Sequence, residues 1–456
     1  MRRVPSLLVS CMLLGATAAS AQAAPSPAAP ASTPEATPAP AASPTPLCLA
    51  SLPDEDSVAA LLWERSPEFA SARARVASAR SDVVRAGLLP NPELELGANT
   101  LPLGSTNPPG LNRWTEVPNY GVGLSEQLEL GKRGPRKDAA RAALASTALE
   151  VQALLRARTY DLLERTAEVA TAEVRVAELE KLAADAARLT ELQRARAQHG
   201  ETAGLDADRA ALEEAQLQGQ LAEENNHLTE ALLTCSRTVG LACTPFGGLE
   251  AASQFLTTRL ARTLAPVDVQ QRPDLRSLEA QQLSAKSALT LARRRWIPDP
   301  TLRVGYLRDQ FVISGNQRDS LGINLTIPLP FFDHGQADAL AASATAEAAE
   351  RARAQLTAQA GRDLTALTTQ RQSVETRRER VRTQTLPQAA NLVQRLEAAV
   401  KAGGASMLDL LFARRTYGQL VLDAADLDLA AFRLSVSMER VRGAGPKPPG
   451  ELAEHF

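Results

Sequence analysis

The sequence GQADALAASATAEAAERARAQ opens a stretch that runs from Gly335 to Lys401. The whole stretch is rich in Ala, Leu, Glu, Gln and Arg, which are strong helix formers, and only Gly361 and Pro387 interrupt it. A continuous helix of this length would be about 100 Å long. A second segment of the same composition runs from Pro135 to Gln198. Because helices in globular domains usually have about 8–20 residues, the sequence predicts a mostly helical protein that is organised on two very long helices.

The segments around the two long helices follow each other in the same order twice, which indicates an internal duplication. The first repeat spans residues 53–240, with a β-hairpin at 93–130, a long helix at 135–198, a turn at 199–204 and a shorter helix. The second spans residues 271–442, with a hairpin at 301–329, a long helix at 335–401, a turn at 402–407 and again a shorter helix. In this alignment Gly200, Leu205 and Asp206 correspond to Gly403, Leu408 and Asp409.

The N-terminus predicts export. Two arginines precede an apolar run that ends in a small-residue cleavage site, so residues 1–23 are expected to be a signal peptide. Residues 24–52 are rich in Ala and Pro, which is typical of an extended tether. A lipobox-like sequence ends at Cys11 and leaves lipidation of that cysteine as an alternative.

Cys48, Cys235 and Cys243 follow the signal peptide, and three is an odd number for an oxidising compartment. Cys235 and Cys243 are close enough in sequence to pair, but a buried thiol and a spare one fit the sequence equally well. Lys plus Arg total 50 and Asp plus Glu total 52. This near-neutral balance gives no reason to expect nucleic-acid binding.

The two hairpins are the segments expected to cross a membrane. After the N-terminus no apolar run approaches the length of a membrane-spanning helix, whereas Leu321 to Ile327 alternates between apolar and small or polar residues. Each hairpin lies between two helices, so both hairpins are expected at the same end of the long helices. Four strands cannot close a barrel, and lipid does not tolerate an open sheet edge. Several copies of the chain are therefore expected to combine their strands in one barrel.

Several short motifs lie next to the hairpins or within the second long helix. They are Leu89-Pro90-Asn91-Pro92-Glu93-Leu94, Glu129-Leu130-Gly131-Lys132-Arg133, Ile327-Pro328-Leu329-Pro330-Phe331-Phe332 and Leu386-Pro387-Gln388-Ala389. In these motifs, and over nearly all of its mature length, the chain resembles the TolC-like outer-membrane efflux family. Within the family it is most similar to the outer-membrane channels of heavy-metal RND export systems, of the cobalt–zinc–cadmium and copper–silver type.

The resemblance implies a homotrimer in the outer membrane. It would have a twelve-stranded β-barrel, with four strands from each chain, and an α-barrel tunnel across the periplasm. Residues 241–270, which read as irregular, and the C-terminal tail 443–456 would form an equatorial belt. The implied function is a passive duct that carries metal cations outward from an inner-membrane RND pump and a periplasmic adaptor. The alternatives are a duct for drugs or organic solutes and a periplasmic adaptor.

The sequence predicts no enzyme, because it shows no catalytic, cofactor-binding or metal-binding pattern. His199, His227, His334 and His455 are scattered and form neither an HxxxH nor an HExxH pair. Gly131-Lys132-Arg133 lacks the earlier glycine of a phosphate-binding loop. An adaptor would carry a small domain of contiguous strands, and the sequence contains none, so a duct is favoured.

The two turns and the residues that follow them are the candidate functional positions. The turns are the predicted periplasmic tips that dock the adaptor, through Gly200, Ala203, Leu205, Gly403, Ser406 and Leu408. In TolC-like channels aspartates just after the second tip close the periplasmic end, and Asp409 matches the first of them. The second position is Phe412, which predicts one acidic ring with an apolar collar. Asp206 is the repeat-related residue, and helix capping is the alternative role of both aspartates.

Overall fold

A computed structural model of the chain describes residues 46–49, 55–199, 204–262, 268–312, 317–443, 445–447 and 449–450. The signal peptide and most of the tether predicted from the sequence lie outside these residues. The helices are α1 (Glu55–Arg65), α2 (Pro67–Gly87), α3 (Arg133–Gln198), α4 (Gly204–Val239), α5 (Leu249–Leu260), α6 (Pro273–Arg293), α7 (Gln336–Arg380), α8 (Leu386–Lys401) and α9 (Met407–Arg442). The strands are β1 (Leu47–Cys48), β2 (Glu93–Asn99), β3 (Asn119–Gln127), β4 (Cys243–Thr244), β5 (Thr301–Asp309) and β6 (Asp319–Thr326).

The two predicted hairpins join into one antiparallel sheet with the strand order β2-β3-β5-β6. Leu124 lies opposite both Leu94 and Val304, and Val304 lies opposite Ile323, so one apolar row crosses all four strands. Because side chains alternate between the two faces of a strand, Gly123, Gly305 and Gly322 form a neighbouring row on the opposite face. The alternation of the sequence therefore produces one apolar face and one face of small and polar residues.

The first long helix is continuous, and the second is interrupted. α3 has 66 residues, whereas the second long segment consists of α7, a π-helical turn at Val381–Thr385 and α8. Pro387 explains the interruption, because proline has no N–H to bond to the carbonyl four residues earlier, and the helix shifts its pairing locally. At this turn Arg378 donates to Asp428 of α9 over 2.6 Å, and Arg382 pairs with the same carboxylate.

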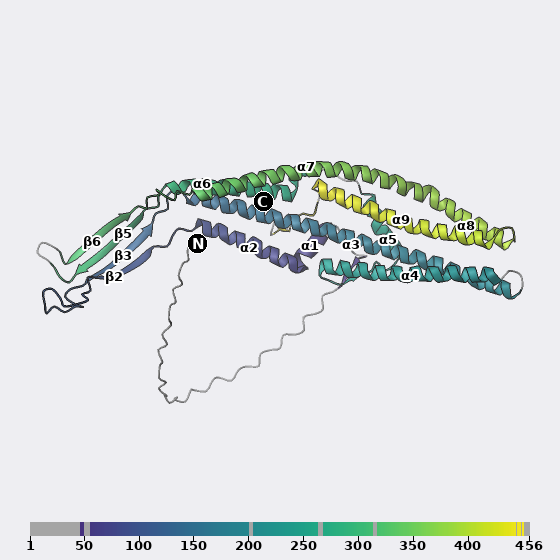
Figure 1. Ribbon diagram of the computed structural model, residues 1–456, viewed down its shortest axis with the longest axis horizontal. Coiled ribbons are helices and arrows are strands. Elements are labelled where there is room, and N and C mark those ends of the chain that lie inside the picture. The colour runs from purple at the N-terminus through teal and green to yellow at the C-terminus, as the bar shows by residue number, and fades with distance from the viewer. Residues whose placement is uncertain are drawn as a thin grey trace, which may run out of the picture. The chain divides into compact units, whose positions relative to one another are not determined.

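The elements follow the order of the predicted duplication. α2, β2, β3, α3 and α4 correspond to α6, β5, β6, α7–α8 and α9, and both α2 and α6 have 21 residues and begin with proline. Figure 1 shows the four-stranded sheet at one end of the helices, and the ends of α3 and α8 next to the starts of α4 and α9 at the other. The hairpins and the tips are therefore separated by the full length of α3.

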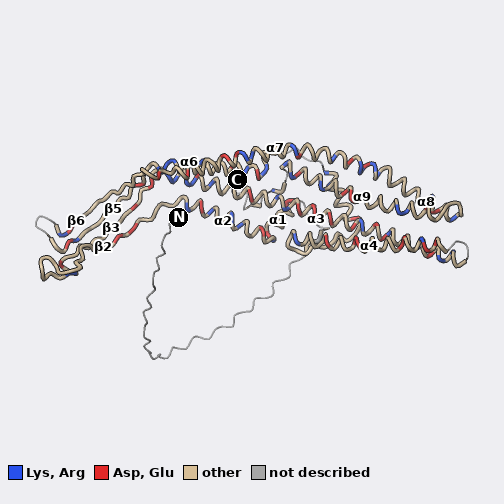
Figure 2. The backbone as a smooth tube through the Cα atoms, in the orientation of Figure 1, with Lys and Arg blue, Asp and Glu red and all other residues tan. Residues whose placement is uncertain are grey.

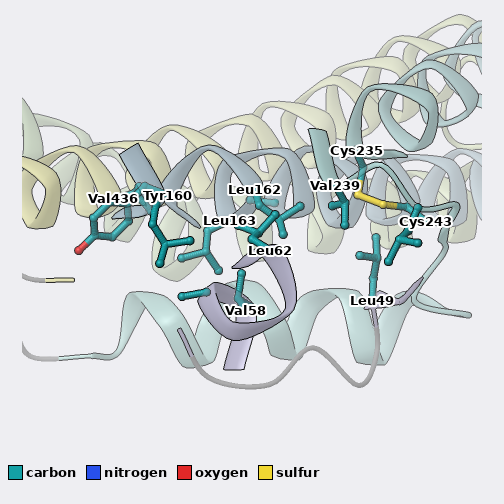
Figure 3. Packing of buried hydrophobic residues seen from close by; sticks show 14 of the residues in the cluster. Leu49, Val58, Leu62, Tyr160, Leu162, Leu163, Cys235, Val239, Cys243 and Val436 are labelled. Atoms are coloured by element: carbon teal, nitrogen blue, oxygen red, sulfur yellow. A yellow bond between two sulfur atoms is a disulfide. The ribbon is translucent and has the colours of Figure 1, made fainter. Parts of the chain in front are cut away.

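The main hydrophobic core surrounds the middle of α3, where α1, α5, the end of α4 and the end of α9 pack (Figure 3). The prediction of an irregular segment at 241–270 was wrong for α5. Its Phe255 packs on Phe246 and Phe432, with ring centroids 5.2 and 5.6 Å away. A disulfide joins Cys235 to Cys243 in the same core, which settles the pairing that the sequence left open.

Buried carboxylates link the elements of this core. Glu173 of α3 accepts a hydrogen bond of 2.6 Å from the backbone N–H of Phe246, and burial raises the pKa of its carboxyl group. Burial also raises the pKa of Glu439 in α9, although Arg259 of α5 pairs with it. These contacts fix α5 and the segment before it against the two helices that run past them.

Candidate functional site

The end of α3 and the start of α4, which flank the first predicted tip, lie beside the end of α8 and the start of α9 at one end of the helices (Figure 1). A small cluster of buried apolar side chains joins α4 to α9 there, and we call it the tip cluster: Ala210, Met407, Leu410 and Leu411. Side chains of α3 and α8 pack against it, and Gln193 of α3 is in contact with the sulfur of Met407 at 3.6 Å. The two helix pairs α3–α4 and α8–α9 are therefore held to each other at their ends.

Behind the tip cluster the two helix pairs are less tightly packed. A cavity of about 140 Å³ lies between α3, α4, α8 and α9, with Leu182, Leu217 and Val393 in its wall. At its edge α9 comes close to α3 again at Gly418, where an added Cβ would lie 3.0 Å from Leu182. The tip cluster and the contact at Gly418 thus hold the helix pairs on either side of a void.

Among the predicted docking residues, Gly403, Ser406 and Leu408 form the second tip. Gly403 has a φ of 76°, and Ser406 caps α9 by accepting a hydrogen bond of 3.1 Å from the N–H of Leu408. Leu205 and Leu408 are 58% and 50% exposed in the first turns of α4 and α9. Gly200 and Ala203, the predicted residues of the first tip, lie outside the described residues.

Gly403→Ala should destabilise the protein by about 1–2 kcal/mol, because an L side chain is strained in the left-handed region. The measurement is the thermal unfolding midpoint of the purified protein. Gly404→Ala is the matched control, because Gly404 is not among the residues with positive φ and an added Cβ there meets only the Ala399 carbonyl at 3.8 Å. Equal effects of the two substitutions would contradict the conformational explanation.

Two of the three predicted gate residues, Asp409 and Phe412, are exposed in the first turns of α9, and the third, Asp206, is half-buried in the first turn of α4. Asp409 is exposed in the first turn of α9, and among the described residues no basic side chain forms an ion pair with it. Phe412, one turn later, is 73% exposed. Asp206 differs from Asp409, because Arg209 lies 3.3 Å from its carboxylate. Since Ser406 supplies the cap of α9, the Asp409 carboxylate has no structural partner in this part of the chain.

At the opposite end, the motifs beside the hairpins form the junction between strands and helices. Asp299 accepts a hydrogen bond of 3.0 Å from the N–H of Leu130. It also forms an ion pair of 2.7 Å with Lys132. Arg136 holds Glu129 at 2.9 Å and also donates to the carbonyls of Ala86 and Leu88. These contacts connect both hairpins to α2 and α3, which gives the polar residues of the motifs a structural role.

The described residues contain no group of three or more His, Cys, Asp or Glu side chains that could hold a metal ion. None of the helices in the described part of the chain combines the length and the apolar character of a membrane-spanning segment.

Comparison with known protein families decides what this arrangement is. A family described as "Outer membrane efflux protein" matches residues 58–241 and 268–440, which cover nearly all of both repeats. The chain belongs to this family. It is an outer-membrane efflux channel of a tripartite system, with a helical tunnel in the periplasm, and not an enzyme. The resemblance found in the sequence motifs is thereby confirmed.

The relatives of this chain are named for different compounds. The cobalt–zinc–cadmium resistance protein CzcC of Cupriavidus metallidurans is 25% identical over 80% of this chain and 84% of its own length. The pyoverdine export outer membrane protein OpmQ of Pseudomonas aeruginosa is 27% identical over 86% of this chain and 85% of its own length. The crystal structure of CusC has the same fold, with a TM-score of 0.69 at 15% identity, over 89% of this chain and 98% of CusC.

Sequence reasoning missed the interactions that link the helices along this efflux channel. Arg378 and Arg382 meet Asp428 at the π-helical turn, and Arg175 of α3 pairs with Glu224 of α4 over 2.5 Å. The partners are about 50 residues apart in sequence, so no local pattern connects them. Pro387 inside a long helical stretch was the one available signal for the turn.

Proposed function

We propose that three copies of the chain form one duct, with a twelve-stranded β-barrel in the outer membrane and an α-barrel tunnel in the periplasm. The proposal rests on one observation: the two ends of the helices carry different structures, and the length of α3 separates them. One end is a four-stranded sheet with an apolar face, and the other end carries the tips. The two structural repeats and an equatorial segment at 241–270 with the tail 443–456 are the domains of this proposal.

The sheet supports assembly. On its apolar face Leu94 is 67% exposed and Ile323 is 68% exposed, which is a large apolar surface that a soluble monomer would rarely leave uncovered. Within the described sheet, the outer strands β2 and β6 each pair on one side only. Pairing β6 of one copy with β2 of the next would close the barrel and remove both edges. Four strands per chain and three chains give the twelve strands proposed.

The duct takes its substrate from a periplasmic adaptor and an inner-membrane RND pump and releases it outside the cell. Metal cations are the proposed cargo, because CzcC is a relative in metal resistance and three Asp409 carboxylates near the axis would favour cations. An organic solute is the second candidate, because OpmQ, a pyoverdine exporter, matches this chain over a similar length.

Cysteine crosslinking tests the direction of the duct. Leu205→Cys and Leu408→Cys place thiols at the exposed starts of α4 and α9, and both should crosslink to the helical tip of the adaptor in cells. Leu340→Cys is the matched control, because Leu340 is 73% exposed near the start of α7, at the sheet end. A crosslink to the adaptor from the control alone would show that the direction is reversed.

A further inference from the structure

Exposed apolar side chains gather at the junction between the sheet and the helices, and we call them the apolar band. Its members come from all four connections, and six of them are Leu89, Leu130, Trp296, Leu329, Phe331 and Phe332, with exposed fractions from 44% to 94%. On β6 the apolar alternation continues beyond the end of the strand as Ile327, Leu329 and Phe331. The apolar face of the sheet thus extends into the junction and is widened there by aromatic side chains.

Basic residues also lie in the junction, at the start of α3 and at the end of α6 (Figure 2). Residues 129–137 and 293–299 contain seven Lys or Arg and only two acidic residues, Glu129 and Asp299. The two segments touch, because Arg294 donates to the carbonyl of Gly131 and Leu130 donates to Asp299. Residues 293–299 also contact the start of α7, where Arg295 lies 2.7 Å from Asp338, and the rings of Trp296 and His334, just before α7, lie 5.7 Å apart.

Four of these basic side chains have no carboxylate partner in the described part of the chain, and one of them, Arg294, bonds to the Gly131 carbonyl. We call the other three the basic band: Arg133, Lys137 and Arg293. The available acids are taken, since Asp299 pairs with Lys132, Glu129 pairs with Arg136, and Asp338 pairs with Arg295. Stabilisation of the helices that carry these side chains does not fully explain the basic band. The first turn of α3 has no acidic residue, and cations at a helix N-terminus oppose the helix dipole.

We propose that the apolar band and the basic band together bind anionic phospholipid of the leaflet on the helix side of the sheet. The apolar and aromatic side chains would lie among the acyl chains and at the headgroup level. The basic band would meet the phosphate groups, because Lys and Arg beside an anionic surface each add to binding. The inference rests on the proposed position of the sheet in the outer membrane.

Trp296 supplies a reporter for the experiment. The purified full-length chain carries Trp114→Phe, because Trp114 is exposed in the connection between β2 and β3, while Trp63 lies in the helical core. The protein is reconstituted in phosphatidylcholine bilayers, and quenching of its fluorescence is measured with brominated phosphatidylglycerol and with brominated phosphatidylcholine. We expect phosphatidylglycerol to associate several-fold more strongly.

Arg133→Gln, Lys137→Gln and Arg293→Gln together should remove most or all of that several-fold preference. The matched control is Arg362→Gln, Arg377→Gln and Arg380→Gln on α7, which removes the same charge away from the junction and should keep the preference. Equal quenching by both lipids in the unmodified protein, or an unchanged preference in the first triple variant, would overturn the lipid inference alone. No quenching by either lipid would overturn the proposed membrane position as well.

Discussion

Ile323→Arg is expected to abolish recovery of assembled channel from the outer membrane. Ile323 is 68% exposed in the middle of β6, in the row that includes Val304 of β5. On the proposed lipid face, an Arg near the midplane of the membrane costs about 2–4 kcal/mol per chain, and each assembled barrel would contain three copies. The measurement is the amount of heat-labile oligomer extracted by detergent from outer membranes.

Asn324→Arg is the matched control. It lies one residue further along the same strand and therefore on the opposite face of the sheet, in register with Arg303 of β5. Its row already carries charge, because Arg303 forms an ion pair of 2.6 Å with Glu95 of β2. In the proposed barrel this face lines a polar, water-filled interior, so the substitution should be tolerated and the yield of oligomer should stay near normal. Normal yield from Ile323→Arg, or loss of oligomer from Asn324→Arg alone, would contradict the assignment of the lipid face.

The elements of this fold were predictable wherever a local pattern determines the structure. Alternation from Leu321 to Ile327 and the composition of 135–198 were sufficient to place a strand and a helix. α5 escaped prediction, because its helix depends on burial of Phe255 between side chains that lie far away in sequence. The π-helical turn was missed for a similar reason, since a proline in a helix does not show how the backbone adapts to it.

The candidate site was predictable only in part. The junction motifs were recognisable as short sequence motifs. The ion pair between Lys132 and Asp299, however, joins residues 167 positions apart and forms only when the two hairpins meet. At the second tip, sequence left open whether Asp409 caps a helix. The structure shows Ser406 in the capping position, which a Ser three residues before an acidic residue could have indicated.

Asp409→Asn is expected to weaken block of the channel by divalent cations about tenfold, which corresponds to about 1.4 kcal/mol, and to lower its cation preference. In the proposed trimer three Asp409 carboxylates converge near the axis, and rings of carboxylates select cations. The side chain is exposed, no ion pair neutralises it within the described residues, and Phe412 is exposed one turn away. The measurement is single-channel recording in planar bilayers, with the divalent cation added on the side of the tips.

Asp206→Asn is the matched control, because it makes the same chemical change at the repeat-related position. The carboxylate of Asp206 is already paired with Arg209 at 3.3 Å, so its contribution to the potential at the axis should be small and the block should hardly change. Phe412→Ala should leave cation preference intact and raise conductance, because it removes the apolar collar and keeps the charge. If Asp409→Asn and Asp206→Asn behave alike, or if neither changes the block, Asp409 is not the gate, and the closure must lie with other side chains of the tips.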